Sequence, residues 1–389
     1  MAKIKMTPYV LFVLCISTIS LSDTSIENTQ QSIVSNTPET VVQREGTIYN
    51  IKGGIPDNQT LLHLFQQFNI FKGEQAIFHD SGFTNTVAKV NGTESSMING
   101  YLKSSANNFF LINSNGLIFG PDASLDVAGS FFASTADEVN FDNTMDSNIT
   151  NRLQTPVLRM EPVISFGFLD NNIGDIEISG DSTRSQVGLQ VTDNQTISFI
   201  SGNIDIKDKA YIHAPDGAIH LISVGEKGTV QLNQNDVHML DFSQFGNIDI
   251  LGESILDTSG LGGGSVLIRS NTLTVNNSRI QAVTNGSING GLIDISVNDI
   301  WFTNGGYIDS STNSFGNAGT IKIIASGNVS FVGENDAHQI SGVALSSYST
   351  EPDAGNAGKI TIKAAHVSFK DGASIDSATL GTGQHRTWR

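Results

Sequence analysis

The residues of this sequence that could carry out chemistry are acidic side chains that recur at one position of a short pattern. The pattern is Gly-x-Ile-x-Ile, with Val replacing one Ile in one copy, and it occurs seven times between Gly174 and Ile362. Carboxylates on neighbouring strands could hold Ca²⁺, and a base beside them could then abstract a proton. The position between the two apolar residues carries Glu177, Asp205, Asp249, Leu267, Asp294, Lys322 and Thr361.

A catalytic reading of this row is disfavoured by the shortage of bases. Lys and Arg together number only 21, and rows of charged side chains are mostly solvated faces. A Gly-Gly-x-Gly-x-Asp calcium repeat is missing. The eight histidines show no metal-ligand spacing, and His213 and His220 are too far apart to suggest a site. The sequence therefore predicts no catalytic residue, no metal site, no cofactor and a protein that is not an enzyme.

The repeats themselves indicate the elements that carry these side chains. They begin at Gly174, Gly202, Gly246, Gly264, Gly291, Gly319 and Gly358, with spacings of 28, 44, 18, 27, 28 and 39 residues. Runs of four to six alternating apolar and polar residues, separated by Asn, Gly, Ser, Thr and Asp, fill the chain and leave no amphipathic helix. Irregular spacings of this size are typical of a solenoid with loop insertions. We expect an all-β fold.

One repeat shows how a coil is built. LIDISV from Leu292, DIWFTN from Asp299 and GGYIDSS from Gly305 predict three short strands. Alternation places Ile293, Ile295 and Val297 on the inner face. The mature chain of 389 minus 22, or 367, residues predicts a parallel β-solenoid of roughly 15 coils, which at about 4.8 Å per coil is roughly 70 Å long. The long interval between Gly319 and Gly358 predicts one loop that bulges from the rod.

The first 22 residues predict a secretory signal peptide. Lys3 and Lys5 precede an apolar run from Tyr9 to Ile16, and Ser22 is the expected cleavage site. The only cysteine, Cys15, leaves with this peptide, and no integral membrane segment follows it. Formal charge is 21 minus 38, or −17, and becomes −19 after cleavage, which argues against nucleic acid as a partner.

Beyond the signal, the polar segment 23–45 predicts a disordered lead-in, so the ordered domain should begin near Gly46. At the other end the chain stops in HRTWR, where the pattern predicts another Gly-Gly-x-Ile start. Solenoids normally end in a cap. We therefore expect a chain that is truncated at its C-terminus.

The stretch NFFLINSNGLIFGPDASLDVAGSFFAST, from Asn108 to Thr135, predicts strand, turn and strand. Asn115 and Gly116 suit the positive φ angles of a tight turn. Asn113, Asn115 and Asn69 are expected to form turns through side-chain to backbone hydrogen bonds.

LINSNGLIFG in this stretch resembles the Asn-Pro-Asn-Gly-Ile motif in the haemagglutination-activity domain of two-partner secretion (TPS) exoproteins, the group of filamentous haemagglutinin. LFQQFNIFKGEQAIF, from Leu64 to Phe78, resembles an earlier segment of that domain. The resemblance runs from about Gly46 to Asp142 and more loosely to about Gly225. Ser114 replaces the family's proline, and VAKVNGTE, from Val87 to Glu94, departs from a stretch that commonly carries an arginine and paired glycines.

The resemblance implies a right-handed, single-stranded parallel β-helix with an N-terminal secretion-domain cap. It divides the chain into a secretion domain at 46–150 and a β-helix continuation at 151–389. It implies export through an outer-membrane transporter with periplasmic POTRA domains. The residues expected to serve transporter recognition are Gln66, Gln67, Phe68, Asn69, Asn113, Ser114, Asn115 and Gly116.

The expected function is that of a secreted passenger, an adhesin or surface-structural protein, reaching the surface of a Gram-negative-type bacterium through the periplasm. A host-cell, cell-surface or carbohydrate ligand fits that role. Two alternatives stay open: a β-helical polysaccharide lyase or hydrolase that uses the acidic row, and the N-terminal part of a contact cytolysin.

Overall fold

The computed structural model describes residues 31–140, 165–181, 183, 188–233 and 236–380. The chain divides into two compact units, Met1–Gln31 and Ser32–Arg389, and the fold below is that of the second. The expected signal peptide and the HRTWR end lie outside the described residues. Within the described ranges every regular element is a strand, as predicted.

The repeating unit is a coil of three strands, as the segment after Leu292 predicts. β29 (Leu292–Val297), β30 (Asp299–Thr303) and β31 (Tyr307–Asp309) belong to three different sheets. Ile293 and Ile295 are fully buried on the inner face. Each strand pairs in parallel with the equivalent strand of the next coil, so the unit is a three-sided parallel β-helix.

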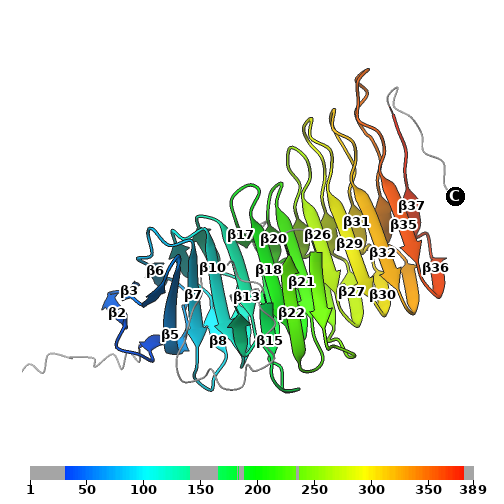
Figure 1. Cartoon of the computed structure of the whole chain (residues 1–389). Helices are drawn as coiled ribbons and strands as arrows, with labels where there is room; N and C mark the ends of the chain where they lie inside the picture. Colours follow the sequence, from blue (N-terminus) through cyan, green and yellow to red (C-terminus); the bar gives the residue numbers. More distant parts are fainter. Residues whose placement is uncertain (1–30, 141–164, 182, 184–187, 234–235, 381–389) are drawn as a thin grey trace, which may run out of the picture. The chain divides into compact units, whose positions relative to one another are not determined.

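The main sheet forms the first side of this helix, and its strands follow one another in chain order (Figure 1). It has 12 strands, of which β1 and β4 pair antiparallel with β5. The remaining ten give ten coils in the described part of the chain, instead of the roughly 15 expected from the length of the mature chain. The strands are β1 (Ile33–Ser35), β4 (Ile55–Asp57), β5 (Thr60–Phe68), β7 (Asn85–Val90), β10 (Asn108–Asn113), β13 (Ser130–Ser134), β18 (Thr196–Ser201), β21 (Ala218–Ser223), β26 (Ser265–Arg269), β29, β32 (Thr320–Ala325) and β35 (Lys359–Lys363).

Two further sides complete the coils. The nine-stranded second sheet contains β8 (Ser96–Ile98), β11 (Leu117–Phe119), β16 (Ile176–Ser179), β19 (Ile204–Lys207), β24 (Ile248–Leu251), β27 (Thr272–Asn276), β30, β33 (Asn328–Val332) and β36 (His366–Lys370). The third side begins with a five-stranded sheet of β2 (Thr40–Glu45), β3 (Ile48–Gly53), β6 (Gln75–Phe78), β9 (Tyr101–Ser104) and β12 (Ser124–Val127). It continues as a seven-stranded sheet of β17 (Leu189–Gln190), β20 (Tyr211–His213), β25 (Ile255–Asp257), β28 (Arg279–Gln281), β31, β34 (Gly342–Ala344) and β37 (Ser374–Asp376).

The core runs through the coils because every strand turns alternate apolar residues inward. Identical side chains then stack from coil to coil. Phe302 and Phe331 lie 4.8 Å apart with rings 5° from parallel, and Phe331 and Phe369 lie 4.9 Å apart with rings 3° from parallel. Phe302 and Phe331 are fully buried, whereas Phe369 in the last described coil is exposed. Full burial of a Phe side chain stabilises the fold by about 1.5–3 kcal/mol. This stacking is the reason that the sheets keep one register throughout.

The Gly-x-Ile-x-Ile pattern occurs at two different corners of the helix, where it begins strands of two different sheets. The sequence alone did not reveal this difference. The copies at Gly174, Gly202 and Gly246 lead into the second-sheet strands β16, β19 and β24. The later copies lead into main-sheet strands, from Gly264 into β26 and from Gly291 into β29. The spacing of 18 residues is therefore a step from one side to another within a coil, not a short coil.

The interval between Gly319 and Gly358 also differs from the prediction of one bulging loop. It contains the third-side strand β34, which separates a hairpin loop at 333–341 from a second loop at 345–357. Loops of the latter kind project from successive coils where the third side turns into the main sheet (Figure 1, yellow to orange).

The N-terminal end of the helix is covered by antiparallel strands. β1 pairs with β5, with Ile33 opposite Phe68, and β2 pairs with β3 around a turn at Gly46, where φ is +64°. Ile33 and Tyr49 are fully buried. The expected disorder up to residue 45 is therefore wrong for β1 and β2, because their apolar residues pack into the first coil.

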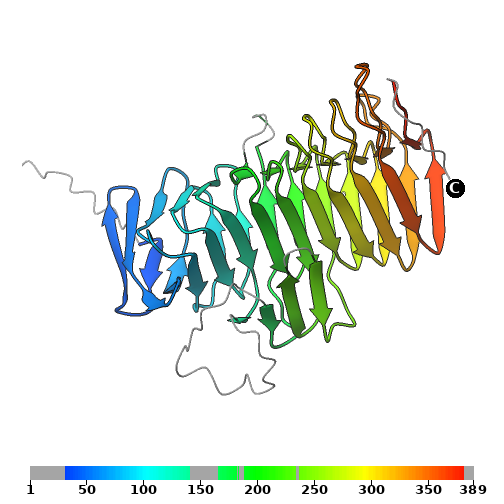
Figure 2. The ribbon, with the colours of Figure 1, turned by 45° about the horizontal axis from the view of Figure 1, so that its top comes forward.

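A four-stranded outer sheet lies outside the coils (Figure 2, green). It is antiparallel and consists of β14 (Glu138–Asn140), β15 (Ser165–Phe168), β22 (Gly228–Asn233) and β23 (Asp236–Leu240). Phe166 and Val230 of this sheet pack on Phe110, Ile112 and other outward residues of the main sheet in a second hydrophobic cluster. Both faces of the main sheet are thus buried along these coils.

Candidate functional site

The Asn113–Gly116 turn is a corner of the β-helix. β10 pairs only with main-sheet strands, and β11 pairs with β8 and β16 of the second sheet. The Gly116 N–H donates to the Asn113 carbonyl over 3.1 Å. Gly116 has φ of +116°, whereas Asn115 has no positive φ. The expectation of two positive φ angles is therefore wrong for Asn115, since the corner needs one left-handed residue and not the pair of a two-residue hairpin.

Asn113 forms the centre of this corner and is fully buried. Its Nδ2 donates to the Glu94 carbonyl and to Ser96 Oγ, each over 3.0 Å. Its Oδ1 accepts from the Asn115 backbone N–H over 3.0 Å and from Asn115 Nδ2 over 3.1 Å. All the polar atoms of this buried amide are therefore used inside the protein, and Asn113 has a structural role.

Asn69 lies in the preceding coil and contacts the segment 94–97, to which Asn113 also donates hydrogen bonds. Its Oδ1 accepts from the Met97 N–H over 2.8 Å, and its own N–H donates to the Ser32 carbonyl over 2.9 Å. Asn69 and Asn113 thus hold residues 94–97 from two sides. The stretch Val87–Glu94, which departs from the family pattern, leads directly into this segment.

Asn115 and Gln66 form the exposed part of the corner. Asn115 Nδ2 donates to the Gly92 carbonyl over 2.9 Å. Gly92 in turn lies against the Gln66 carbonyl so closely that a Cβ would not fit. Gln66 and Asn115 are exposed and Ser114 is half-buried. We call the surface of Gln66, Gly92, Ser114 and Asn115 the exposed corner.

Gln67 and Phe68 lie away from the exposed corner. Gln67 is half-buried and pairs with Val34 of β1. Phe68 is fully buried, and its ring lies 4.9 Å from that of Phe65. Phe68 is therefore part of the core and Gln67 pairs with a cap strand, so neither residue belongs to the exposed corner.

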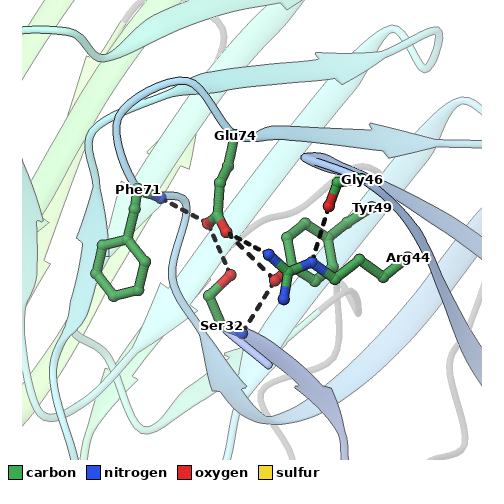
Figure 3. A network of polar contacts seen from close by, with 6 residues as sticks. All are labelled: Ser32, Arg44, Gly46, Tyr49, Phe71 and Glu74. Atoms are coloured by element: carbon green, nitrogen blue, oxygen red, sulfur yellow. Dashed lines mark hydrogen bonds and ion pairs between the residues drawn. The ribbon is translucent and has the colours of Figure 1, made fainter. Parts of the chain in front are cut away.

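A polar network around Glu74 joins the cap strands to the first coils (Figure 3). Glu74 Oε2 accepts from Ser32 Oγ over 2.8 Å and from the Phe71 N–H over 2.9 Å. Glu74 Oε1 lies 3.5 Å from Arg44 Nη2, and the Tyr49 hydroxyl accepts from the Ser32 N–H over 3.1 Å.

Sequence reasoning missed this network because Ser32 and Arg44 fall in the segment read as disordered. The signal was present: the apolar residues Val41, Val42, Ile48 and Tyr49 flank Gly46 as in a hairpin.

His63 and Asp80 are buried polar residues close to the cap. Asp80 accepts from Thr86 Oγ1 over 2.8 Å and from the Ser105 N–H over 2.9 Å. His63 has no hydrogen-bond partner at either ring nitrogen, and its ring lies 5.4 Å from that of Phe78. Burial lowers the pKa of His63 to about 4, against a smaller opposing effect of the Asp80 charge. The imidazole is therefore neutral at physiological pH.

The acidic row of the repeats divides between two sides of the helix. Glu177, Asp205 and Asp249 are register partners in the second sheet. Leu267, Asp294, Lys322 and Thr361 are register partners in the main sheet. The expectation of one continuous row is therefore wrong.

Each half of the row contains an ion pair. Lys207 Nζ lies 2.8 Å from Glu177 Oε1, and burial, together with the Asp249 charge, raises the pKa of Asp205. In the main sheet Asp294 Oδ2 lies 3.2 Å from both Arg269 and Lys322. Among the residues that the structure describes, no group of three or more His, Cys, Asp or Glu is arranged to hold a metal ion.

One protein family matches the N-terminal part of this chain. A family model of the TPS secretion domain matches residues 27–268, which is wider on both sides than the expected domain at 46–150. No curated relative matches the chain. No helix in the described ranges is long and apolar enough to cross a membrane.

Seventeen solved chains are similar to this chain, among them two secretion domains. One is the HMW1 secretion domain from Haemophilus influenzae, at 17% identity and a TM-score of 0.44, covering 90% of this chain and 98% of that chain. The other is a filamentous hemagglutinin secretion domain, at 13% identity and a TM-score of 0.43, covering 90% of this chain and 100% of that chain.

Proposed function

This chain belongs to the TPS secretion domain family, and we propose from that premise that it is the passenger of a two-partner secretion system, recognised by an outer-membrane transporter through the exposed corner. The observation that carries the proposal is the family match over residues 27–268. That range includes the N-terminal cap, the exposed corner and the coils up to β26.

The contacts of the exposed corner support a recognition role for Asn115 and Gln66. Both side chains are exposed. The Asn115 amide donates to the buried Asn113 and to the Gly92 carbonyl of the neighbouring coil, and the Gln66 backbone packs against Gly92. A transporter domain would therefore meet a preformed surface and would not have to order it, which lowers the entropic cost of binding. Asn113 and Asn69 lie beneath this surface and hold its backbone in place by hydrogen bonds.

The cap supports a directional folding step after export. Antiparallel β1 and β2 cover the N-terminal coil, so new coils add to the opposite end only. Each added coil pairs its three strands with three existing edges and buries its apolar face at once. The only cysteine is Cys15, so no disulfide can trap the unfolded passenger on its way through the periplasm.

We further propose that the exported protein is a non-enzymatic adhesin or surface-structural protein, secreted or held at the surface of a Gram-negative-type bacterium after removal of residues 1–22. The loops that project between the third side and the main sheet support this role. They expose one large apolar side chain per coil, namely Leu261, Ile288, Phe315 and Tyr348. Side chains of this kind on successive loops are suited to contact with a partner surface.

Export is tested by producing the full chain in a Gram-negative host with and without the transporter encoded in the same genome. We expect the protein outside the cell only with the transporter. Asn115→Ala should reduce export severalfold, because it removes the exposed amide.

Asn298→Ala is the matched control. Asn298 is an exposed residue that follows a main-sheet strand, as the corner residues do, but it lies beyond the family match. Transporter-independent export would contradict the proposal. Normal export of the Asn115 variant would show that the transporter does not recognise the exposed corner.

A further inference from the structure

We infer that a groove on the third side of the helix, between the coils of β20 and β34, binds a neutral oligosaccharide chain. The groove has a volume of about 1250 Å³ and is lined by Thr183 and by residues between Lys209 and Ile340. That is above the roughly 300–1,000 Å³ of pockets for compact small molecules. An open channel that crosses several coils suits an extended chain.

The floor of the groove consists of outward residues on consecutive third-side strands. Tyr211, Ile255 and Arg279 are register partners in β20, β25 and β28. The Tyr211 hydroxyl donates to Asp257 Oδ2 over 3.0 Å, which fixes the orientation of its ring. The exposed Arg279 guanidinium has no hydrogen-bond or ion-pair partner among the described residues. The Tyr211 ring and the Arg279 fork of N–H donors lie two strands apart along the floor. They can therefore contact the ring of one sugar and the hydroxyl groups of a neighbouring sugar in the same chain.

A hairpin loop at Glu334–Ile340 forms the wall of the groove. Asn335 Nδ2 donates to Asn277 Oδ1 over 2.8 Å, which ties the loop to the corner two coils back. Asn335 Oδ1 accepts from the Ala337 and Gln339 N–H groups over 3.0 and 2.9 Å. The loop crosses Gly305, where a Cβ would lie 2.6 Å from the Gln339 carbonyl. The wall is therefore fixed in place by its own contacts and by a glycine beneath it.

The charges of the lining select a neutral ligand. Among the Lys, Arg, Asp and Glu residues of the lining, Lys209 and Arg279 give two positive charges, and Glu253, Glu334 and Asp336 give three negative ones, so their sum is 2 minus 3, or −1. Lys209 already lies 3.6 Å from Glu253. A polyanion needs a clear excess of positive charge. The side-chain amides of Asn304 and Gln339 instead provide donors and acceptors for hydroxyl groups.

A peptide that adds a strand is a poor fit to this groove. The third-side strands beneath it, β20, β25, β28 and β31, each pair on both sides. No backbone edge is therefore open for strand addition, and Ile255 is the one aliphatic residue of the floor.

The inference rests on the proposed function in one respect, since the groove meets extracellular glycans only if the protein is exported. Binding is measured on the purified full chain and involves no transporter. Loss of binding and loss of export can therefore be distinguished.

The test titrates cellohexaose, xylohexaose, chitohexaose and maltohexaose into the protein by isothermal titration calorimetry. We expect at least one of them to bind. Arg279→Ala and Gln339→Ala should each weaken that binding about tenfold, as loss of one hydrogen bond to the ligand predicts. Gln281→Ala is the matched control, because Gln281 lies in β28 beside Arg279 but outside the groove lining.

Circular dichroism of each variant establishes that its fold is kept. Absence of binding to all four oligosaccharides overturns the inference, and so does equal weakening by the Gln281 control. Displacement of the bound oligosaccharide by gelatin peptides in a manner sensitive to Gln339→Ala would identify a polypeptide ligand and overturn it as well.

Discussion

The buried amide of Asn113 holds the exposed amide of Asn115: one oxygen, Asn113 Oδ1, accepts hydrogen bonds from both the backbone and the side chain of Asn115. The two asparagines of the Asn-Ser-Asn-Gly corner therefore have different tasks. The first is a buried connector, and the second is a surface group whose direction the first determines.

This division of tasks predicts different effects of two alanine substitutions on stability. Asn113→Ala leaves the Glu94 carbonyl, Ser96 Oγ and the Asn115 N–H without a partner and should lower the free energy of unfolding by about 3 kcal/mol. Asn115→Ala removes one exposed and one half-buried bond, keeps the backbone N–H bond to Asn113, and should cost about 1 kcal/mol or less. Urea unfolding followed by circular dichroism measures both. Equal losses would contradict the assignment of separate tasks.

Ser114→Pro should stabilise the corner. Ser114 is the second residue of a turn closed by the Asn113 carbonyl and the Gly116 N–H, a position where proline fits. Proline restricts the unfolded chain, and a gain of about 0.4–1 kcal/mol is expected. The midpoint of urea unfolding should rise, with export unchanged. A lower midpoint would show that the Ser114 backbone does not suit proline.

Glu74→Ala should loosen the N-terminal cap. It removes the acceptor of Ser32 Oγ and of the Phe71 N–H, and a loss of about 2–3 kcal/mol is expected. Glu74→Gln keeps an acceptor oxygen and should lose less. Hydrogen exchange should then increase first in β1 and β2. Unchanged protection of these strands in the alanine variant would contradict the role of Glu74 in the cap.

His63 predicts a loss of stability in mild acid. Its pKa lies near 6.5 in the unfolded chain and near 4 in the folded protein, so the unfolded chain binds the proton more tightly. The free energy of unfolding should therefore fall as pH decreases from about 6.5 to about 4, and at pH 4.5 the cost reaches about 2.5 kcal/mol.

His63→Leu should remove this part of the loss and leave stability at pH 7.5 similar or higher. A further loss in acid should remain in the variant, since burial, followed by the nearby Arg269 charge, also lowers the pKa of His220 to about 4. The check is a series of urea titrations between pH 4.5 and 7.5. An identical pH dependence in the variant and the parent protein would refute the effect.

The coils were predictable from sequence where neighbouring residues determine them. Alternation in the Leu292–Val297 segment gave the strand, the inward residues and the three-sided coil, because these depend on a period of two and on short corners. The cap was not predictable in this way, since Ile33 and Arg44 acquire their roles from pairing with β5 and from the Glu74 carboxylate, both distant in sequence.

The site was predictable in part for the same reason. Asn113 and Asn115 stand next to a glycine corner and are visible locally. The burial of Phe68 and the contact of Gly92 with Gln66 depend on which coil lies next, as does the loop that crosses Gly305. Glycine corners with the same local sequence also lead to different sheets. The division of the acidic row between two sides could therefore be seen only from the strand register in three dimensions.

That shared corner sequence limits how genes of this kind can change in length. Unequal crossing-over between the segments at Gly264 and Gly291, or at Gly291 and Gly319, removes 27 or 28 residues and one whole coil. Crossing-over between Gly246 and Gly264 would remove 18 residues. Every later strand would then lie on a different side of the three-sided helix and pair with strands of the wrong sheet. Gain and loss of length should therefore proceed between repeats of the same side, although at the level of the pentapeptide all seven look like equivalent partners for recombination.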